Sequence, residues 1–288
     1  MDNDGERDVV HDDLAAAELE WRSGLPQIIE KFARYWSLQL GPPYTQSISA
    51  AWVAPALTAT GNRLVLKLGW THDEALHEAD GLRAWDGNGT VRLIDSVVAG
   101  RTTALLLEAC EPGTQLSQVL PEIQQDLVVA GLLRRLWIEP PARHPFRPLA
   151  QMCDQWAREF EDACRGGAQL DPGIARAGIA LFRELPRTAS QAVLLCTDLH
   201  HDNVLAAQRE PWLVIDPKPY VGDPAYDPVQ HMLNFPGRLA ADPAGLAARM
   251  AGLLDLDAER VRLWLFARCV QESATEPELR GVAARLAP

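Results

Sequence analysis

Cys196-Thr197-Asp198-Leu199-His200-His201-Asp202-Asn203-Val204-Leu205, followed downstream by Trp212-Leu213-Val214-Ile215-Asp216, is the stretch that decides how this chain is interpreted. It holds an aspartate, an asparagine five residues later and a second aspartate thirteen residues beyond that, each beside an apolar run. This layout is typical of a phosphoryl-transfer site of the kinase type. In such sites one carboxylate orients the acceptor hydroxyl, whereas other oxygen ligands hold Mg²⁺ against the nucleotide phosphates.

The apolar runs around these polar residues predict short strands. Ala192–Leu195 predicts a strand that ends just before Asp198, and the residues from Val204 to Ile215 predict a hairpin. The hairpin would bring Asn203 and Asp216 to the same end. Mg²⁺ prefers oxygen ligands and keeps much of its water, so one Asn and one Asp are enough protein ligands. We therefore predict that Asp198 is the catalytic base and that Asn203 and Asp216 bind the metal.

The same loop leaves a different chemistry open. The adjacent His200 and His201 carry imidazoles, which bind transition metals, although no Cys or His at zinc-site spacing follows them. Cys196, four residues before His200, is a residue type that can act as a nucleophile beside a histidine. A metal-dependent or thiol hydrolase therefore stays an alternative to a kinase.

One lysine in the N-terminal third indicates a nucleotide-binding strand. Leu64–Leu68 is the only strand-like run of that third with a lysine inside it, Lys67. A buried lysine needs a carboxylate partner, and a helix predicted over Asp73–Trp85 offers Glu74 and Glu78 one turn apart on one face. The alternative is a lysine on an edge strand that faces water.

With these residues in place, the sequence resembles the aminoglycoside phosphotransferase superfamily, and more closely its streptomycin 6-kinase and hydroxyurea phosphotransferase branch. The resemblance covers the chain from about Trp52 to about Asn234 and is thin between Pro121 and Gln191. The segments that carry it are Thr197–Leu205, Pro211–Pro219 and Val221–Asp227, with Trp52–Pro55 and Leu82–Gly87 upstream.

The resemblance implies an α+β, bilobal protein-kinase-like fold with the ATP site between the lobes. We expect an acidic N-terminal arm over residues 1–20, a sheet-plus-helix lobe over 21–111 and a helix-rich lobe over 112–288. It also implies ATP, or GTP, together with Mg²⁺. The implied acceptor is a hydroxyl of a small cationic or hydroxylated molecule, such as an aminoglycoside of the streptomycin type.

The resemblance also assigns roles to single residues. Asp198 matches the catalytic aspartate of the family, Asn203 and Asp216 match its metal ligands, and Asp227 matches a buried aspartate that braces the catalytic loop. By the spacing of the family, Glu78 is the partner of Lys67.

The remaining assignments concern the nucleotide and the acceptor. Hydroxyl and backbone donors of Ser47, together with Ser49, are expected at the phosphates, and the backbone around Glu108 and Cys110 at the purine edge. The acceptor residues of the family are often acidic and lie near the C-terminal helices, which indicates Asp223 and Glu272.

The sequence departs from the pattern of the family in the catalytic loop, where Thr197 also replaces a frequent glycine or aromatic residue, and in the expected phosphate loop. Cys196 stands where a histidine is usual, and the expected phosphate loop, Tyr44–Ala51, contains no glycine although glycine eases close backbone approach to phosphate. A pseudokinase that binds a nucleotide or another ligand without turnover therefore stays open, as does a kinase of another metabolite.

The composition of the chain indicates its compartment and its classes of partner, but not the reaction that it catalyses. The chain has 288 residues, 47% of them hydrophobic, and no apolar run near the roughly 18 residues of a membrane helix. A net charge of −12 disfavours nucleic acid as a partner and suits a cationic ligand. Five cysteines without CxxC spacing predict reduced thiols. We expect a cytoplasmic protein, either monomer or homodimer, without a membrane or nucleic-acid partner.

Apolar residues at helical spacing predict the helices. The first spans Trp21–Leu40, and the second lobe is expected to contain Leu116–Trp137, Leu149–Cys164, Gly173–Leu185, Pro224–Leu233, Ala241–Leu254 and Ala258–Glu272.

Overall fold

The computed structural model describes residues 16–44, 51–71, 77–165 and 170–288. Within this part the chain divides into two compact units. The first consists of the chain up to Ala79 together with Arg92–Ala109, and the second consists of Asp80–Val91 together with Cys110–Pro288.

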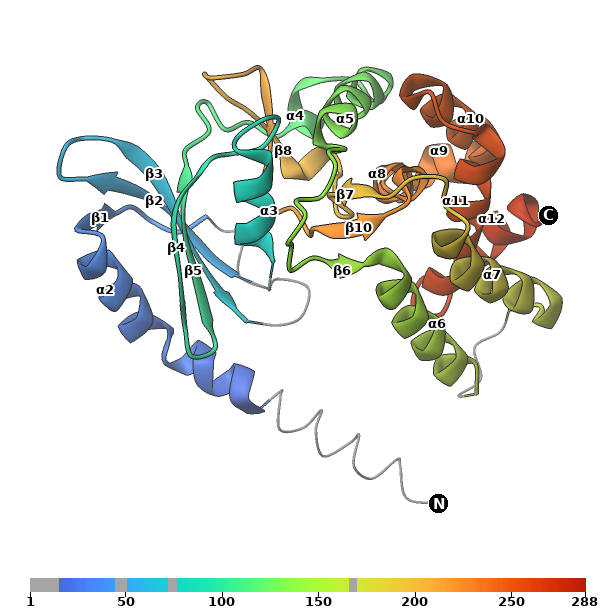
Figure 1. Ribbon diagram of the computed structural model, residues 1–288, viewed down its shortest axis with the longest axis horizontal. Coiled ribbons are helices and arrows are strands. Elements are labelled where there is room, and N and C mark those ends of the chain that lie inside the picture. The colour runs from blue at the N-terminus through green and yellow to red at the C-terminus, as the bar shows by residue number, and fades with distance from the viewer. Residues whose placement is uncertain (1–15, 45–50, 72–76, 166–169) are drawn as a thin grey trace. The chain divides into compact units, whose positions relative to one another are not determined.

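The first unit is built on an antiparallel sheet with the strand order β1-β2-β3-β5-β4 (Figure 1). Its strands are β1 (Leu38–Leu40), β2 (Ala51–Thr58), β3 (Arg63–Trp70), β4 (Leu93–Ala99) and β5 (Thr102–Glu108). Strand β3 is central, so Lys67 lies opposite Val53 of β2 and Leu105 of β5. The alternative of an edge-strand lysine is therefore wrong.

Helix α2 (Leu25–Tyr35) packs on this sheet through one apolar face. Phe32 is buried there with Leu66 and Leu68 of β3. The helix predicted to reach Leu40 ends at Tyr35, because Ser37 adopts a left-handed φ of 52° that no helix can continue through. The three residues Leu38–Leu40 pair with β2 instead, which corrects the sequence prediction.

The second unit is mainly helical. Its helices are the end of α3 (Glu78–Trp85), then α4 (Leu116–Val119), α5 (Glu122–Leu136), α6 (Leu149–Arg165), α7 (Pro172–Glu184), α8 (Pro228–Leu233), α9 (Pro236–Ala241), α10 (Pro243–Leu254), α11 (Ala258–Glu272) and α12 (Leu279–Leu286). Short 3₁₀ turns are η2 (Leu185–Arg187), η3 (His201–Asn203) and η4 (Pro224–Tyr226). This unit also contains two small sheets. One has three strands in the order β6 (Arg147–Pro148), β10 (Tyr220–Gly222) and β7 (Val193–Leu195), and the other is a hairpin of β8 (Val204–Ala206) and β9 (Trp212–Val214).

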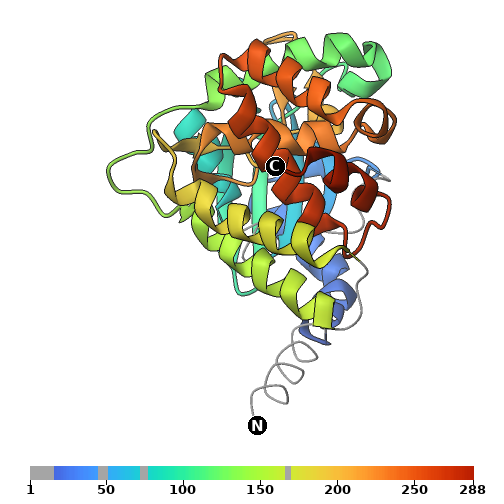
Figure 2. The ribbon, with the colours of Figure 1, turned by 90° about the vertical axis from the view of Figure 1, so that its right-hand side faces the viewer.

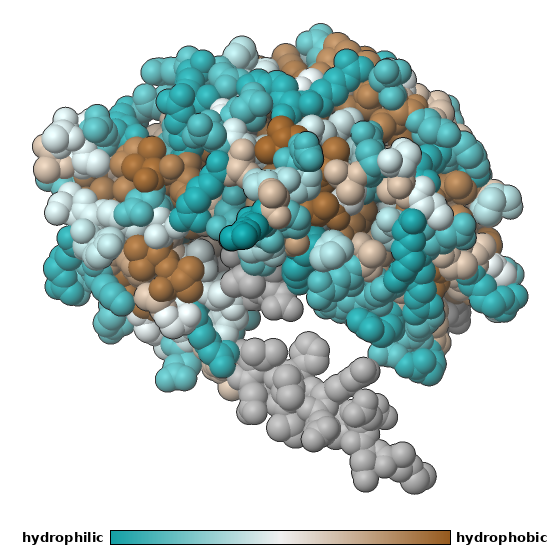
Figure 3. Space-filling view, in the orientation of Figure 1, coloured by the Kyte–Doolittle hydropathy of each residue, from teal (hydrophilic) through white to brown (hydrophobic). Residues whose placement is uncertain are grey.

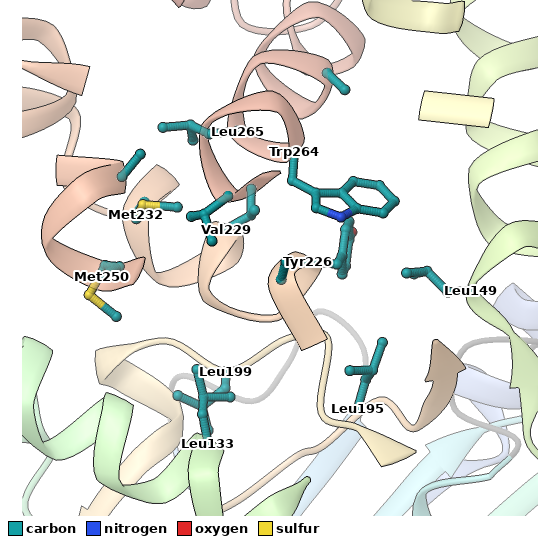
Figure 4. Close-up of a cluster of buried hydrophobic side chains, with 14 of the residues drawn as sticks. Leu133, Leu149, Leu195, Leu199, Tyr226, Val229, Met232, Met250, Trp264 and Leu265 are labelled. Carbon is teal, nitrogen blue, oxygen red and sulfur yellow. The ribbon is translucent and has the colours of Figure 1, made fainter. Parts of the chain in front are cut away.

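Helix α11 is the centre of the core of this unit. It packs against α7, α10 and α12 (Figure 2) and buries nearly its whole middle section. Trp264 of α11 is fully buried, and its ring meets the ring of Tyr226 edge-on at 5.0 Å between centroids (Figure 4). This core fixes η4 and therefore the residues that follow β10.

In the second unit, proline accounts for two places where the helix predictions failed. The predicted helix Leu116–Trp137 is broken after Val119, because Pro121 cannot continue it and instead precedes α5. The predicted helix from Pro224 is split at Pro228 into η4 and α8. Helices α6, α7, α10 and α11 confirm their predictions within a few residues, whereas α12 and the pairing of β6 with β10 were not predicted.

The exposed surface of the face shown in Figure 3 is mostly hydrophilic, with separate apolar areas. No described helix combines the length and the hydropathy that crossing a membrane would need.

Candidate active site

The loop after β7 is held by a buried carboxylate. Asp227 accepts hydrogen bonds from the backbone N–H of Cys196 at 3.1 Å and of Thr197 at 2.7 Å. The indole Nε1 of Trp137 donates to the same carboxylate at 2.9 Å. Burial raises the pKa of Asp227 to about 6, although the three donors favour its charged form. We infer that Asp227 braces the loop, as the resemblance implied.

Thr197 adopts a left-handed backbone with φ 48°, which is unfavourable for a β-branched residue. Its neighbours fix this conformation: its Oγ1 donates to the carbonyl of Lys218 at 2.6 Å, and the N–H of Lys218 donates to the carbonyl of Cys196 at 3.0 Å. Asp198 follows directly, with its own N–H donating to the Cys196 carbonyl at 2.7 Å. The turn therefore points the chain out of the strand at Asp198.

The predicted hairpin is present. Strands β8 and β9 pair antiparallel, and the pairing extends one step further, because the N–H of Ile215 donates to the carbonyl of Asn203 at 2.9 Å. Asn203 also donates its side-chain Nδ2 to the carbonyl of Asp198 at 3.0 Å. Asp216 is the next residue after Ile215 and has a φ of 52°. The hairpin thus brings Asn203 next to Asp198 and to the start of Asp216.

The donor chemistry of these side chains fits Mg²⁺. The amide nitrogen of Asn203 is engaged with Asp198, which makes the amide oxygen its ligand atom. Asp216 supplies a carboxylate, and one or two such ligands are the usual protein share for Mg²⁺ on a nucleotide. Over residues 16–44, 51–71, 77–165 and 170–288 no group of three or more His, Cys, Asp or Glu could hold a metal by itself.

Sequence reasoning missed Lys218. Its Nζ lies 2.8 Å from Oδ2 of Asp198, and the two side chains are 33% and 20% exposed. The only signal in the sequence is that Lys218 comes two residues after Asp216 in the segment Asp216-Pro217-Lys218-Pro219.

His200, His201 and Cys196 of this loop are held by contacts with the surrounding protein. Nδ1 of His200 accepts the N–H of Asp202 at 3.4 Å, and burial lowers the pKa of this imidazole. The ring of His201 lies 4.8 Å from the ring of Phe235. Cys196 is fully buried, and burial raises the pKa of its thiol well above the ordinary value. A buried thiol that resists ionisation does not suit a nucleophile, so these surroundings give no support to the hydrolase alternative.

On the central strand of the first unit, Lys67 forms the expected ion pair with Glu78. Its Nζ lies 2.8 Å from Oε1 and 2.7 Å from Oε2 of Glu78, and the side chains are only 12% and 5% exposed. The other candidate partner, Glu74, lies outside the described residues, as do Ser47 and Ser49.

The residues expected at the purine lie at the end of β5. Glu108 closes that strand: its N–H donates to the carbonyl of Arg92 at 2.9 Å, and its carboxylate accepts the N–H of Arg92 at 2.9 Å. Cys110 follows two residues later and is partly exposed. Their role at the purine stays a prediction.

The two acidic residues expected at the acceptor differ from each other. Asp223 is buried; it caps η4 and accepts hydrogen bonds from Nε of Arg260 at 2.6 Å and from Nε1 of Trp264 at 2.7 Å. Asp223 therefore helps to hold this core together, and its role at the acceptor stays a prediction. Glu272, at the end of α11, forms an ion pair with Arg268 at 2.8 Å. Because its side chain is partly exposed, its contact with the acceptor stays a proposal.

These features define a phosphotransferase of the kinase type: a loop with Asp198 and Asn203, a hairpin that leads to Asp216, and a lysine on a central strand held by a helix glutamate. Solved structures with this fold include an aminoglycoside phosphotransferase from Streptomyces rimosus in complex with ADP and streptomycin. It is 17% identical, with a TM-score of 0.59 over 86% of this chain and 98% of that chain. A choline kinase from Cryptosporidium parvum matches with a TM-score of 0.60 at 11% identity, over 91% of this chain and 93% of that chain. The fold is therefore α+β and protein-kinase-like.

Sequence comparison identifies the family. The model of the aminoglycoside/hydroxyurea antibiotic resistance kinase family matches residues 38–279. A hydroxyurea phosphotransferase from Kitasatospora aureofaciens is 35% identical over 93% of this chain and 78% of its own length. A streptomycin 6-kinase from Streptomyces griseus is 34% identical over 90% of this chain and 85% of its own length. The chain belongs to the aminoglycoside/hydroxyurea antibiotic resistance kinase family and is a small-molecule kinase that uses ATP, which confirms the resemblance drawn from its motifs.

Proposed function

We propose that this protein transfers the γ-phosphoryl group of ATP, with Mg²⁺, to a hydroxyl group of an aminoglycoside of the streptomycin type. The observation that carries the proposal is the contact of Asn203 with Asp198 on a loop whose hairpin leads directly to Asp216. The 34% and 35% identical streptomycin 6-kinases support the choice of acceptor. The net charge of −12 favours a cationic acceptor over an anionic one.

In the proposed reaction the acceptor hydroxyl donates its hydrogen bond to Asp198. Its oxygen forms a bond to the γ-phosphorus while the bond between that phosphorus and the bridging oxygen of ADP breaks, and the hydroxyl proton passes to Asp198. Asn203 and Asp216 would hold Mg²⁺, which when bound neutralises charge on the phosphates. Lys67, fixed by Glu78, binds the α- and β-phosphates.

The role of the remaining residues follows from their packing. Asp227 and Thr197 keep the loop in the conformation that presents Asp198. Ser47, Glu108 and Cys110 stay as proposed contacts of the nucleotide, with GTP as an alternative to ATP. We place the reaction in the cytoplasm, because the five cysteines of the sequence have no CxxC spacing, which is usual for thiols of a reducing compartment.

Hydroxyurea is a second candidate acceptor, because a hydroxyurea phosphotransferase covers 93% of this chain at 35% identity. It carries no cationic group, so it would not exploit the acidic charge of the protein. A kinase of another metabolite and a nucleotide-binding pseudokinase remain alternatives to both acceptors.

The test is to incubate the purified protein with ATP and Mg²⁺ and each of a panel of acceptors: streptomycin, other aminoglycosides, hydroxyurea, choline and simple sugars. Mass spectrometry then identifies any acceptor that gains one phosphate. We expect phosphorylated streptomycin, with the product lost when EDTA removes Mg²⁺ and regained when Mg²⁺ is added back. Phosphorylation of hydroxyurea alone would replace streptomycin with the second candidate. Nucleotide binding without any product would contradict the proposal and favour a pseudokinase.

A further inference from the structure

Lysine is rare in this protein, and its positions are informative. The chain contains three lysines and twenty-four arginines, so its surface basic residues are almost all arginine. Lys31 is exposed on α2. The other two lysines each lie against a carboxylate: Lys67 against Glu78 and Lys218 against Asp198. Two of the three lysines therefore contact residues proposed to act in phosphoryl transfer.

The backbone around Lys218 is fixed on both sides. Its N–H and its carbonyl are bonded to Cys196 and Thr197 of the loop that presents Asp198. Pro217 and Pro219 flank it, and proline fixes its own φ near −65° and restricts the residue before it. The ammonium group is thus presented from a rigid segment, and little chain entropy is lost when it binds a partner.

The distance to Asp198 places the ammonium group near the reacting atoms. A hydroxyl that donates to Asp198 lies about 2.6–3.2 Å from the carboxylate oxygen, and its own oxygen lies about 3–3.5 Å from the phosphorus at attack. Nζ of Lys218 is already 2.8 Å from Oδ2 of that carboxylate. A cation bonded to the base is therefore within reach of the oxygens of the transferred phosphoryl group.

We propose that Lys218 is a second catalytic residue, whose ammonium group binds the oxygens of the γ-phosphoryl group in the transition state. Before the acceptor binds, the ammonium pairs with Asp198. During transfer the acceptor oxygen bonds to phosphorus, the bond to the ADP oxygen breaks and the hydroxyl proton moves to Asp198. Asp198 loses its negative charge in that step, so the ammonium turns to the phosphoryl oxygens, which carry the developing charge. This inference rests on the proposed function.

The side-chain chemistry fits this exchange of partners. A lysine ammonium is a compact charge with three rotatable donors, so it can bond a carboxylate oxygen and a phosphoryl oxygen together. A guanidinium is planar and prefers to hold one carboxylate through two parallel bonds. In a chain that otherwise uses arginine, lysine at residue 218 is the residue type that this role needs.

The test compares Lys218→Met and Lys218→Arg with the wild type and with Lys31→Met as a matched control. Two quantities are measured: kcat with streptomycin, and the affinity for ADP with and without aluminium fluoride, which mimics the transferred phosphoryl group. We expect Lys218→Met to lower kcat about 10²- to 10³-fold, the usual loss for one transition-state donor. The affinity for ADP alone should stay within about threefold, whereas the additional affinity that aluminium fluoride confers should disappear. Lys218→Arg should recover part of both losses, and Lys31→Met should change neither.

The fluoride measurement does not depend on the identity of the acceptor, so it separates the two proposals. A wild type that shows neither turnover nor tighter binding with aluminium fluoride would contradict the proposed function itself. A wild type that shows tighter binding, with Lys218→Met showing the same gain, would overturn the role of Lys218 and leave the proposed function intact. A loss of stability in Lys218→Met without loss of the fluoride gain would mean that the ion pair is only structural.

Discussion

The two lysine–carboxylate pairs of this protein differ in burial. Lys67 lies against both oxygens of Glu78, and these side chains are 12% and 5% exposed. Lys218 lies 2.8 Å from Oδ2 of Asp198, and these side chains are 33% and 20% exposed. A buried pair cannot open without leaving a charge unsatisfied, whereas a partly hydrated pair can exchange one partner for another. The comparison therefore separates an ion pair that fixes geometry from one that can take part in a reaction.

We expect the largest loss of stability from a substitution that breaks the buried pair of Lys67 and Glu78. Lys67→Met should lower the free energy of unfolding by about 3–5 kcal/mol, because Glu78 is then left charged and buried. Lys218→Met should cost about 1 kcal/mol or less, because water can solvate Asp198. Urea unfolding of the two variants beside Lys31→Met measures the difference. Equal losses for the two pairs would remove the basis of the comparison.

Sequence reasoning found the parts of the site that depend on local order. Asp198, Asn203 and Asp216 lie beside apolar runs that form β7, β8 and β9, and pairing of neighbouring strands follows from the short turn between them. Lys67 was found because a charged residue inside an apolar strand needs an explanation. The positions of these residues could be predicted because strands and hairpins are determined by residues that are close together in the sequence.

Lys218 could not be found in this way. Its contact with Asp198 depends on left-handed φ angles at Thr197 and Asp216 and on the prolines around it, none of which gives a periodic signal. The internal role of Asp223 was missed for a similar reason, because its partners Arg260 and Trp264 come from a helix far along the chain. The breaks at Pro121 and Pro228, by contrast, could have been read from the sequence, since proline interrupts helices.

A second prediction concerns the segment that joins the reactive pair to its loop. Thr197→Val removes the hydroxyl that donates to the carbonyl of Lys218 at 2.6 Å and leaves that carbonyl without this donor. We expect a loss of about 1–2 kcal/mol in the free energy of unfolding. Thr197→Ser keeps the hydroxyl and should stay within about 0.5 kcal/mol of the wild type. If Ser and Val at this position are equally destabilising, the hydrogen bond does not hold the turn.

The smallest predicted effect is a pH dependence at Asp227. The folded-state pKa of about 6 is raised from 3.8, so between these values the folded protein binds a proton that the unfolded chain does not. The stability from this group is therefore fully present below about pH 4 and is lost as the pH rises through 6. The gap in unfolding free energy between wild type and Asp227→Asn should be about 1 kcal/mol wider at pH 5 than at pH 7.

The control for this prediction is Asp171→Asn, which replaces an exposed helix cap with another good cap. Its difference from the wild type in unfolding free energy should be the same at pH 5 and at pH 7. A gap for Asp227→Asn that narrows at pH 5 would mean that Asp227 is not held in a site that disfavours its charge.

The catalytic role of Asp198 is tested by measuring the turnover of ATP with the acceptor by Asp198→Asn, beside the binding of ATP to the same variant. We expect turnover to fall about 10³-fold while the affinity for ATP stays within about threefold, because Asp198 acts on the acceptor hydroxyl and not on the nucleotide. Turnover that stays near the wild-type rate would contradict the assignment of Asp198, and with it the role proposed for Lys218.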